Sequence, residues 1–312
     1  MDRTSRFAVG CDLGGTRLKT VLLDRGRLKH ESVQLVPTDS AASILDTLVE
    51  AVRAALDGRP PASLGIAVPG FLDPRRRTIE LLANLPVLDG YPLASRMGRR
   101  LSRRLIGPPV LDADSNAGAY AEATRGTAQR SRRVLYLSLG TGVSAAMVCD
   151  GCIQRVSRHT VGQIAHLPLE EDGCKCSCGR RGCVEATLSA RGIVWRARRR
   201  GLRGPAAGSP EAVFDAAQAG AAEARAVWRD VGNLVGDISG RLAGLWDPDH
   251  VVVGGGIAGA AGLFLKTARA RLDRKLPPRL RGHVQLDRSH WGAVAGAVGA
   301  ALIGADHAFP KT

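Results

Sequence analysis

Two stretches decide the fold: FAVGCDLGGTRLKTVLLD, residues 7–24, and VLYLSLGTGVSAAMVC, residues 134–149. Each contains an apolar strand, a tight glycine and threonine turn, and a second apolar strand. Because a strand resumes directly after the turn, each stretch predicts a β-hairpin rather than the strand-to-helix turn of a Rossmann fold or a Walker P-loop. This repetition is the main organisational feature of the sequence.

Length and composition place the chain among folded proteins. Its 312 residues allow two domains at about 150 residues each. A content of 45% hydrophobic and 23% charged residues excludes intrinsic disorder as the main state. The sequence has no apolar run of the roughly 18 residues that a membrane span needs, and the N-terminus has no signal-peptide core. We therefore expect a cytoplasmic protein with no membrane partner.

The chain is strongly basic, with a formal net charge of +15. Only six of its 44 basic residues are lysines, a skew typical of a GC-rich genome. A polyanionic partner such as nucleic acid or polyphosphate is the alternative. Aromatic residues make up 4% of the chain, and the arginine clusters at 75–77, 99–104 and 196–200 are not interleaved with stacking side chains. We expect no nucleic-acid partner.

The remaining periodicities alternate between strands and helices. Further strands are predicted at 27–35, 64–68, 110–111, 250–253 and 284–286. Helices are predicted at 41–56, 93–105, 184–200, 210–219, 221–246, 257–272 and 291–303, with another that begins near residue 114. The last of the numbered helices is rich in small residues, which predicts close packing against a neighbour.

Four of the seven cysteines fall within ten residues, at Cys174, Cys176, Cys178 and Cys183. A disulfide framework would spread its cysteines through the chain, whereas a tight cluster in a cytosolic protein favours a metal. With His166 as a further ligand, three thiolates complete a tetrahedral zinc shell, and such a closed shell indicates a structural site. Cys174 and Cys176 compete for one position.

Five blocks together resemble the ROK family (repressor, open reading frame, kinase), which includes bacterial sugar kinases and sugar-responsive repressors. The blocks are Asp12–Thr16, Ala113–Asn116, Leu139–Gly142, Gly162–His166 with Cys176–Glu185, and Val253–Gly256. The resemblance covers nearly the whole chain, and its zinc block favours Cys176 over Cys174. The implied fold is the actin-like ATPase (ribonuclease H-like) fold, in which two α/β domains flank a cleft and one carries a structural zinc loop.

The resemblance also implies a division of the chain. Residues 1–115 plus 290–312 would form a smaller domain with the first phosphate hairpin and the catalytic aspartate. Residues 116–289 would form a larger domain with the second phosphate hairpin, the zinc loop and the adenosine turn. A repressor of this family needs an N-terminal DNA-binding domain, and the first strand here starts at Phe7. We therefore expect a kinase, and a homodimer.

Three glycine turns match the family's ATP-binding positions. Glycine allows close approach, so backbone N–H groups of the two hairpin turns can contact phosphate oxygens. Asp12 would orient Mg²⁺ through its water shell, and the third turn would pass beside adenine or ribose. The expected ATP-binding residues are Asp12, Gly14, Gly15, Thr16, Arg17, Gly140, Thr141, Gly142, Gly254, Gly255 and Gly256.

Asp114 matches the family's catalytic aspartate. It would accept the proton of the attacking hydroxyl as the P–O bond forms. A plain helix N-cap is the alternative role for this residue. Asp112 is a nearby rival for the base, but Asn116, two residues after Asp114, matches the family register.

Four further residues match positions that contact the sugar: Asn84, Gln163, His166 and Glu185. His166 could bind zinc through one ring nitrogen and a sugar hydroxyl through the other. Asn84 could instead be a turn residue, and Glu185 a first-turn helix carboxylate.

The sequence departs from the family pattern at the acceptor contacts. Gln163 stands where the family usually has Glu, and Ala113 where it has Asn. Ser144-Ala-Ala146 also replaces a glycine-rich stretch after the second turn. The Gln163 change removes a charge-assisted acceptor, the Ala113 change removes hydrogen bonds, and Ser144-Ala-Ala146 adds Cβ bulk, while the phosphate turns are kept. They suggest an ATP-dependent kinase whose acceptor is an amino sugar, a deoxy sugar or a cyclitol rather than glucose.

Two alternatives stay open at this point. The edited site could belong to a non-catalytic sugar-binding sensor. The basic charge could also suit a glucokinase that uses polyphosphate as donor.

Overall fold

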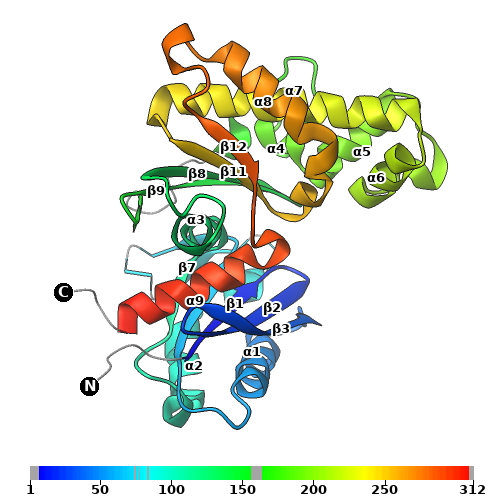
Figure 1. Ribbon diagram of the computed structural model, residues 1–312. Helices are drawn as coiled ribbons and strands as arrows, with labels where there is room; N and C mark the ends of the chain where they lie inside the picture. The colour runs from blue at the N-terminus through cyan, green and yellow to red at the C-terminus, as the bar shows by residue number, and fades with distance from the viewer. Residues whose placement is uncertain (1–6, 74, 77, 83, 156–163, 309–312) are drawn as a thin grey trace. The chain divides into compact units, whose positions relative to one another are not determined.

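The computed structural model describes residues 7–73, 75–76, 78–82, 84–155 and 164–308 (Figure 1). The chain divides into two compact units. The first comprises Met1–Gly126, Ile153–Val161 and Ala293–Thr312, and the second comprises Thr127–Cys152 and Gly162–Gly292. Each unit contains one five-stranded sheet.

The sheet of the first unit has the order β3-β2-β1-β4-β7. Its strands are β1 (Phe7–Leu13), β2 (Arg17–Asp24), β3 (Arg27–Leu35), β4 (Ser63–Val68) and β7 (Val110–Ala113). The pairs β1–β2 and β2–β3 are antiparallel, whereas β4 is parallel to both β1 and β7. The first expected hairpin is therefore confirmed. A small ribbon of β5 (Phe71–Leu72) and β6 (Ile79–Leu81) follows β4.

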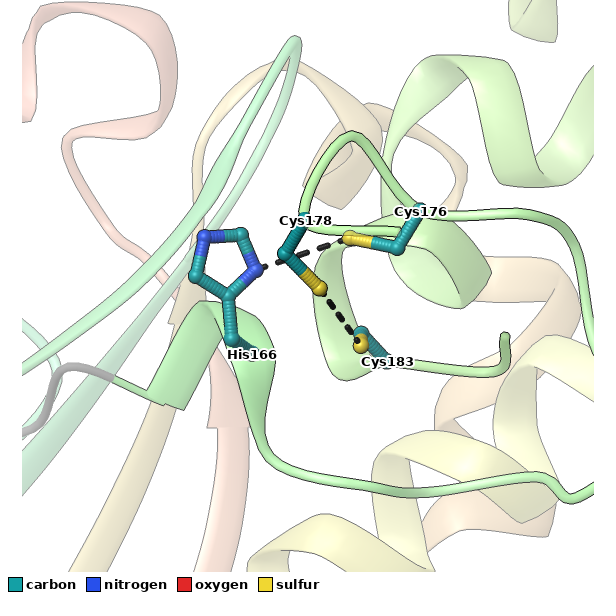
Figure 2. Close-up of side chains that lie close together, drawn as sticks. All are labelled: His166, Cys176, Cys178 and Cys183. Atoms are coloured by element: carbon teal, nitrogen blue, oxygen red, sulfur yellow. Dashed lines mark hydrogen bonds between the residues drawn. The ribbon is translucent and has the colours of Figure 1, made fainter. Parts of the chain in front are cut away.

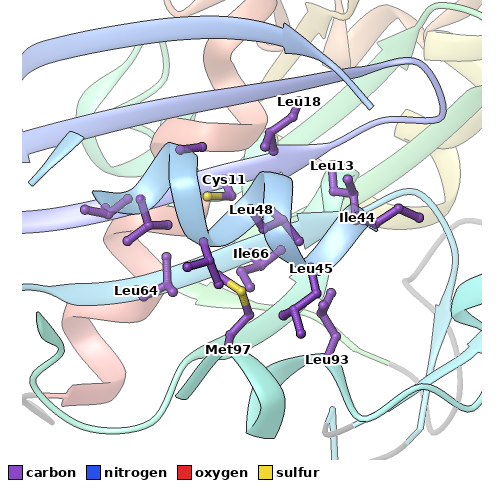
Figure 3. Close-up of a cluster of buried hydrophobic side chains, with 14 of the residues drawn as sticks. Cys11, Leu13, Leu18, Ile44, Leu45, Leu48, Leu64, Ile66, Leu93 and Met97 are labelled. Atoms are coloured by element: carbon purple, nitrogen blue, oxygen red, sulfur yellow. The ribbon is translucent and has the colours of Figure 1, made fainter. Parts of the chain in front are cut away.

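The main apolar core of the first unit includes one face of β1, because side chains alternate across a strand. Figure 3 shows Cys11 and Leu13 of β1 packed with residues of α1 (Ala41–Ala55) and with Met97 of α2 (Leu93–Arg100). The Ser40 hydroxyl caps α1 by accepting a hydrogen bond from the Ser43 N–H at 3.1 Å. Helix α2 ends at Arg100, and a 3₁₀ turn replaces the rest of the helix expected up to residue 105.

The other face of β1 is covered by α9 (Ala295–Ala308). A Cβ atom at Gly10 would lie 1.9 Å from the Ala297 backbone oxygen, so strand and helix backbones are in close contact. Helix α3 (Asp114–Arg125) packs on the same helix, since a Cβ atom at Gly299 would lie 1.7 Å from the Ala117 oxygen. The expected close packing of the small-residue helix is confirmed.

This packing places α3 in the first unit, whereas the sequence-based division at residue 115 separated it from that unit. The division missed the contact because it joins helices that are far apart in the sequence.

The second unit repeats the arrangement of the first, with the strand order β10-β9-β8-β11-β12. Its strands are β8 (Arg133–Leu139), β9 (Val143–Cys149), β10 (Cys152–Ile153), β11 (His250–Gly254) and β12 (Gln285–Arg288). Strands β8 and β9 form an antiparallel hairpin, and β11 runs parallel to β8 and β12. The second expected hairpin and the actin-like repeat are thus confirmed.

The second unit also contains five α-helices among the described residues. They are α4 (Val184–Leu188), α5 (Ala190–Arg199), α6 (Pro210–Gln218), α7 (Ala222–Trp246) and α8 (Ala261–Lys275). Helices α7 and α8 pack together, with the Trp228 and Phe264 rings stacked at 6.0 Å (Figure 1). The single helix expected over 184–200 is interrupted at Ser189, whose backbone is extended.

Short 3₁₀ helices complete the described structure. They are Pro86–Leu88, Ser102–Arg104, Ile164–His166, Gly204–Ala207, Gly256–Ala260, Pro278–Leu280 and Gly292–Val294. Within the described ranges, no helix is both long enough and apolar enough to cross a membrane.

Candidate functional site

The first glycine turn joins β1 to β2. The Gly14 N–H donates to the Arg17 oxygen at 3.0 Å, which closes the turn. Asn84 lies against it, because a Cβ atom at Gly15 would come within 2.7 Å of the Asn84 Cβ atom. Thr16 and Arg17 are exposed. The structure therefore places Asn84 against the first glycine turn.

Asp12 has a cationic partner that the sequence analysis did not single out. Lys19 is its register partner in the hairpin, and the Lys19 Nζ atom lies 3.3 Å from the Asp12 Oδ2 atom. Burial raises the pKa of Asp12, and the charge of Lys19 opposes that shift. The hairpin pattern could have predicted the pairing of Asp12 with Lys19, because residues at equal distances from the turn face each other.

Asp114 is the first residue of α3 and is half-buried. The N-cap position belongs to Ala113, so Asp114 is not the helix cap. Within the described chain, the only hydrogen bond to its carboxylate comes from the Ser115 N–H, at 2.6 Å. Burial first, and then the charge of Asp12, raise the pKa of Asp114 to about 7. A carboxylate with this pKa can accept a proton near neutral pH.

The rival, Asp112, is buried and fully engaged. Its Oδ1 atom accepts hydrogen bonds from the Ala113 N–H and the Asn116 side-chain amide, both at 2.9 Å. Its Oδ2 atom accepts from Arg76 at 2.9 Å and from Arg155. Both oxygens of Asp112 are therefore occupied by hydrogen bonds within the protein, and Asp114 stays the predicted base.

The other two glycine turns meet at the carboxyl ends of β8 and β11, which are parallel neighbours. In the first of them, the Gly140 N–H donates to the Gly142 oxygen at 3.0 Å. Gly255 has a φ of +80°, and a Cβ atom there would lie 2.3 Å from the Leu139 oxygen. Only glycine fits both the backbone conformation and this approach. The structure thus brings Gly140–Gly142 and Gly254–Gly256 together.

Helices α4 and α5 hold the Gly140–Gly142 turn. The Ala190 N–H, at the start of α5, donates to the Gly140 oxygen at 2.9 Å. The Glu185 Oε2 atom would lie 3.1 Å from a Cβ atom at Gly142. Because the helix is interrupted at Ser189, the Ala190 N–H has no partner in the preceding helical turn and is available to donate to the Gly140 oxygen. Glu185 consequently lies beside the Gly140–Gly142 turn as well as near the cysteine loop.

The four expected metal ligands point toward one another (Figure 2). The ligand atoms of His166, Cys176, Cys178 and Cys183 all lie within 4.8 Å of one another. The Cys176 Sγ atom is 3.5 Å from His166 Nδ1, and the Sγ atoms of Cys178 and Cys183 are 3.6 Å apart. Tetrahedral zinc would separate sulfur from nitrogen by about 3.5 Å and sulfur from sulfur by about 3.8 Å. The donors therefore fit zinc.

The backbone of the loop builds this arrangement. Single β-bridges join Pro168 to Cys183 and Lys175 to Arg181. Gly182 has a φ of +62°, and a Cβ atom there would lie 1.4 Å from the Glu170 oxygen. The loop can therefore fold back only with glycine at this position.

The loop geometry also separates Cys176 from Cys174. Cys174 is buried nearby, and its thiol donates to the Lys175 oxygen at 3.6 Å. It lies outside the four-ligand cluster.

The expected site residues fall into two groups. The first unit holds the Asp12–Arg17 turn, Asn84 and Asp114, and the second holds the other glycine turns, Glu185 and the cysteine cluster. Gln163, an expected substrate contact, lies outside the described residues.

The chain is similar to known proteins over nearly its whole length. The sequence model of the ROK family matches residues 8–307. The chain is 31% identical over 307 residues to the N-acetyl-D-glucosamine kinase of Escherichia coli O1:K1, covering 94% of this chain and 98% of that protein. Among solved structures, it is similar to a ROK family glucokinase from Streptomyces griseus in complex with glucose and AMPPNP. That likeness has a TM-score of 0.81 and 28% identity and covers 95% of this chain and 98% of the other. The ROK hexokinase from Thermus thermophilus gives a TM-score of 0.76 and 31% identity, over 95% and 97%.

Proposed function

The chain belongs to the ROK family, and on that premise we propose that it is an ATP-dependent sugar kinase. It transfers the γ-phosphate of ATP to a hydroxyl group, expected to be primary, of a hexose or hexose-like polyol. The main support for the proposal is the Asp114 carboxylate, which has a pKa of about 7 and lies in the same unit as the first glycine turn. Relatives named as sugar kinases support it over nearly the full chain.

The proposed chemistry follows from the charges at the site. Phosphoryl transfer depends mainly on positioning and on neutralising negative charge. Asp114 takes the proton from the acceptor hydroxyl, while Asp12 orients Mg²⁺ through its water shell. The Gly14 and Gly140 N–H groups already bond within their own turns. Phosphate contacts therefore fall to the N–H groups of the residues that follow each of these glycines.

We propose an amino sugar or a cyclitol as the acceptor. The Escherichia coli relative is an N-acetyl-D-glucosamine kinase, and transfer of that preference to this chain is part of the proposal. Ala113 and Gln163 stand where the family pattern has Asn and Glu, so two hydrogen-bonding groups of a glucose site are changed. Asn84 provides a polar group at the Gly14–Thr16 turn, and Glu185 provides one at the Gly140–Gly142 turn.

The cysteine cluster is proposed to hold one structural Zn²⁺ ion. A closed shell of one imidazole and three thiolates leaves no position for substrate, so the ion would stabilise the loop rather than take part in the reaction. Helix α4 begins directly after Cys183 and carries Glu185. Zinc would thereby help to hold Glu185 beside the Gly140–Gly142 turn.

Turnover with a panel of acceptors tests the proposal. ADP release should require an acceptor, ATP and Mg²⁺, and should be fastest with an amino sugar or a cyclitol. A parallel assay with polyphosphate as donor should give less product, because the Gly254–Gly256 turn suits adenosine. Failure of every sugar, amino sugar and cyclitol at saturating ATP and Mg²⁺ would remove the proposed activity and favour a sugar sensor.

The activity should depend on pH through Asp114. Only the ionised carboxylate can accept the hydroxyl proton, and the pKa of Asp114 is raised to about 7. We therefore expect kcat to fall as the pH drops through about 7, by up to about tenfold per pH unit below it. Direct quantification of phosphorylated product avoids the pH dependence of coupling enzymes. A kcat that stays constant down to about pH 5 would rule out Asp114 as a base with this pKa.

A further inference from the structure

Three charged side chains from separate segments meet two residues before the proposed base. Asp112 is the last residue but one of β7, Arg76 comes from the turn between β5 and β6, and Arg155 follows β10. Both arginines bond the same oxygen of Asp112, Arg76 at 2.9 Å. The Asp112 side chain is 3% exposed, whereas those of Arg76 and Arg155 are 32% and 33% exposed. A buried carboxylate is thus held by two half-buried cations.

The other oxygen of Asp112 is hydrogen-bonded to residues on both sides of Asp114. It accepts the Ala113 N–H and the Asn116 side-chain amide, both at 2.9 Å. Asn116 is 2% exposed, and within the described chain its Oδ1 atom has no hydrogen-bond partner. Its amide orientation is therefore set by Asp112. One carboxylate consequently fixes the junction at which the strand ends and the helix begins.

The backbone of Arg76 adds an independent observation. Its φ is +53°, a left-handed conformation that residues other than glycine rarely adopt. The Arg76 N–H donates to the Asp73 oxygen at 2.7 Å within this turn. Strained backbone of this kind persists where surrounding contacts require it, and it is frequent at functional sites. Here the strain accompanies a side chain directed at Asp112.

We propose that Arg76 and Arg155 are positioning residues for the catalytic base and act on Asp114 through Asp112. The inference rests on the proposed kinase function and deepens it. The two guanidinium groups hold the Asp112 carboxylate, which holds Ala113 and Asn116, and these residues fix the direction of Asp114. Small displacements of a reacting group cost large factors in rate, so this chain of contacts should appear in kcat.

The test compares Arg155→Ala and Arg76→Ala with Arg75→Ala, a control from the same turn whose residue is exposed. Each of the first two variants leaves Asp112 one arginine, so the fold should be kept. We expect kcat to fall by about tenfold or more, with the KM for ATP within about twofold of wild type. Added guanidinium ion, below denaturing concentration, should restore part of the lost kcat in Arg155→Ala. The control should match wild type.

A double mutant separates action through Asp112 from direct contact with the acceptor. If Arg155 acts through Asp112, adding Arg155→Ala to Asp112→Asn should lower kcat no further. Additive losses, or a loss confined to the KM of the acceptor, would overturn the proposal. So would an active wild type whose Arg155→Ala variant behaves like Arg75→Ala.

Hydrogen exchange provides a readout that does not need turnover. In Arg155→Ala, the backbone amides of residues 113–117 should exchange about tenfold faster than in wild type, and those of α9 should not change. Unchanged exchange at residues 113–117 would overturn the positioning role even if no acceptor were found. A wild type that phosphorylates nothing would count against the proposed function instead, so the two failures are distinguishable.

Discussion

Replacement of Asp114 with asparagine is expected to lower kcat by about 10²- to 10⁴-fold. Asparagine keeps the size and polarity of the side chain but cannot accept the hydroxyl proton. Asp57→Asn is a suitable control, because Asp57 is an exposed carboxylate in the same unit. Steady-state kinetics of both variants would measure the effect, and an Asp114→Asn variant with more than half of the wild-type kcat would contradict the assignment.

Loss of activity in this variant should not come from unfolding. The pKa of Asp114 in the folded chain, about 7, is above its ordinary value of 3.8. Between these values the folded state retains a proton that the unfolded state releases, so stability falls as the pH rises through this window. Asparagine does not ionise and removes this loss. At pH 8, a basic condition chosen at roughly one unit above that pKa, the variant should melt no lower than wild type.

Replacement of Cys178 with serine is expected to remove the metal and destabilise the second unit. The wild type should contain one Zn²⁺ ion per chain by metal analysis, and the variant close to none, because serine replaces a thiolate ligand. Structural zinc contributes folding free energy directly, so a large fall in melting temperature should accompany the loss. The KM values for acceptor and ATP should both rise, because α4 holds Glu185 beside Gly142.

Cys174→Ser is the matched control for the zinc prediction. Cys174 is buried in the same loop but lies outside the four-ligand cluster. This variant should retain its zinc and its KM values. Native zinc content in Cys178→Ser, or loss of zinc in Cys174→Ser, would show that the ligand set is wrong.

Local patterns predicted the elements that hold the site. The two hairpins, the strand before Asp114 and the cysteine spacing each depend on neighbours within about 20 residues in the sequence. Periodicity and turn chemistry report such contacts directly. The hairpin register even contained the pairing of Asp12 with Lys19, although the charge of Lys19 was not connected to Asp12 from the sequence.

Contacts between distant segments explain what the sequence did not predict. Arg76 and Arg155 reach Asp112 from segments that are separated from it by 36 and 43 residues. The interruption at Ser189 depends on the Gly140 oxygen, and the place of α3 depends on α9. Propensity and periodicity carry no information about such partners. For the same reason, only the family register, and no local pattern, separated Asp114 from Asp112 in the sequence.

Mass spectrometry of the reaction products is the most direct test of the proposed phosphoryl transfer from ATP to a sugar-like acceptor. Wild type, ATP, Mg²⁺ and each candidate acceptor would be incubated, and both ADP and the acceptor would be quantified. We expect at least one amino sugar or cyclitol to gain a single phosphoryl group, in an amount equal to the ADP formed. We expect Asp114→Asn to form almost no phosphorylated product. ADP without phosphorylated acceptor, or equal product from wild type and Asp114→Asn, would contradict these expectations.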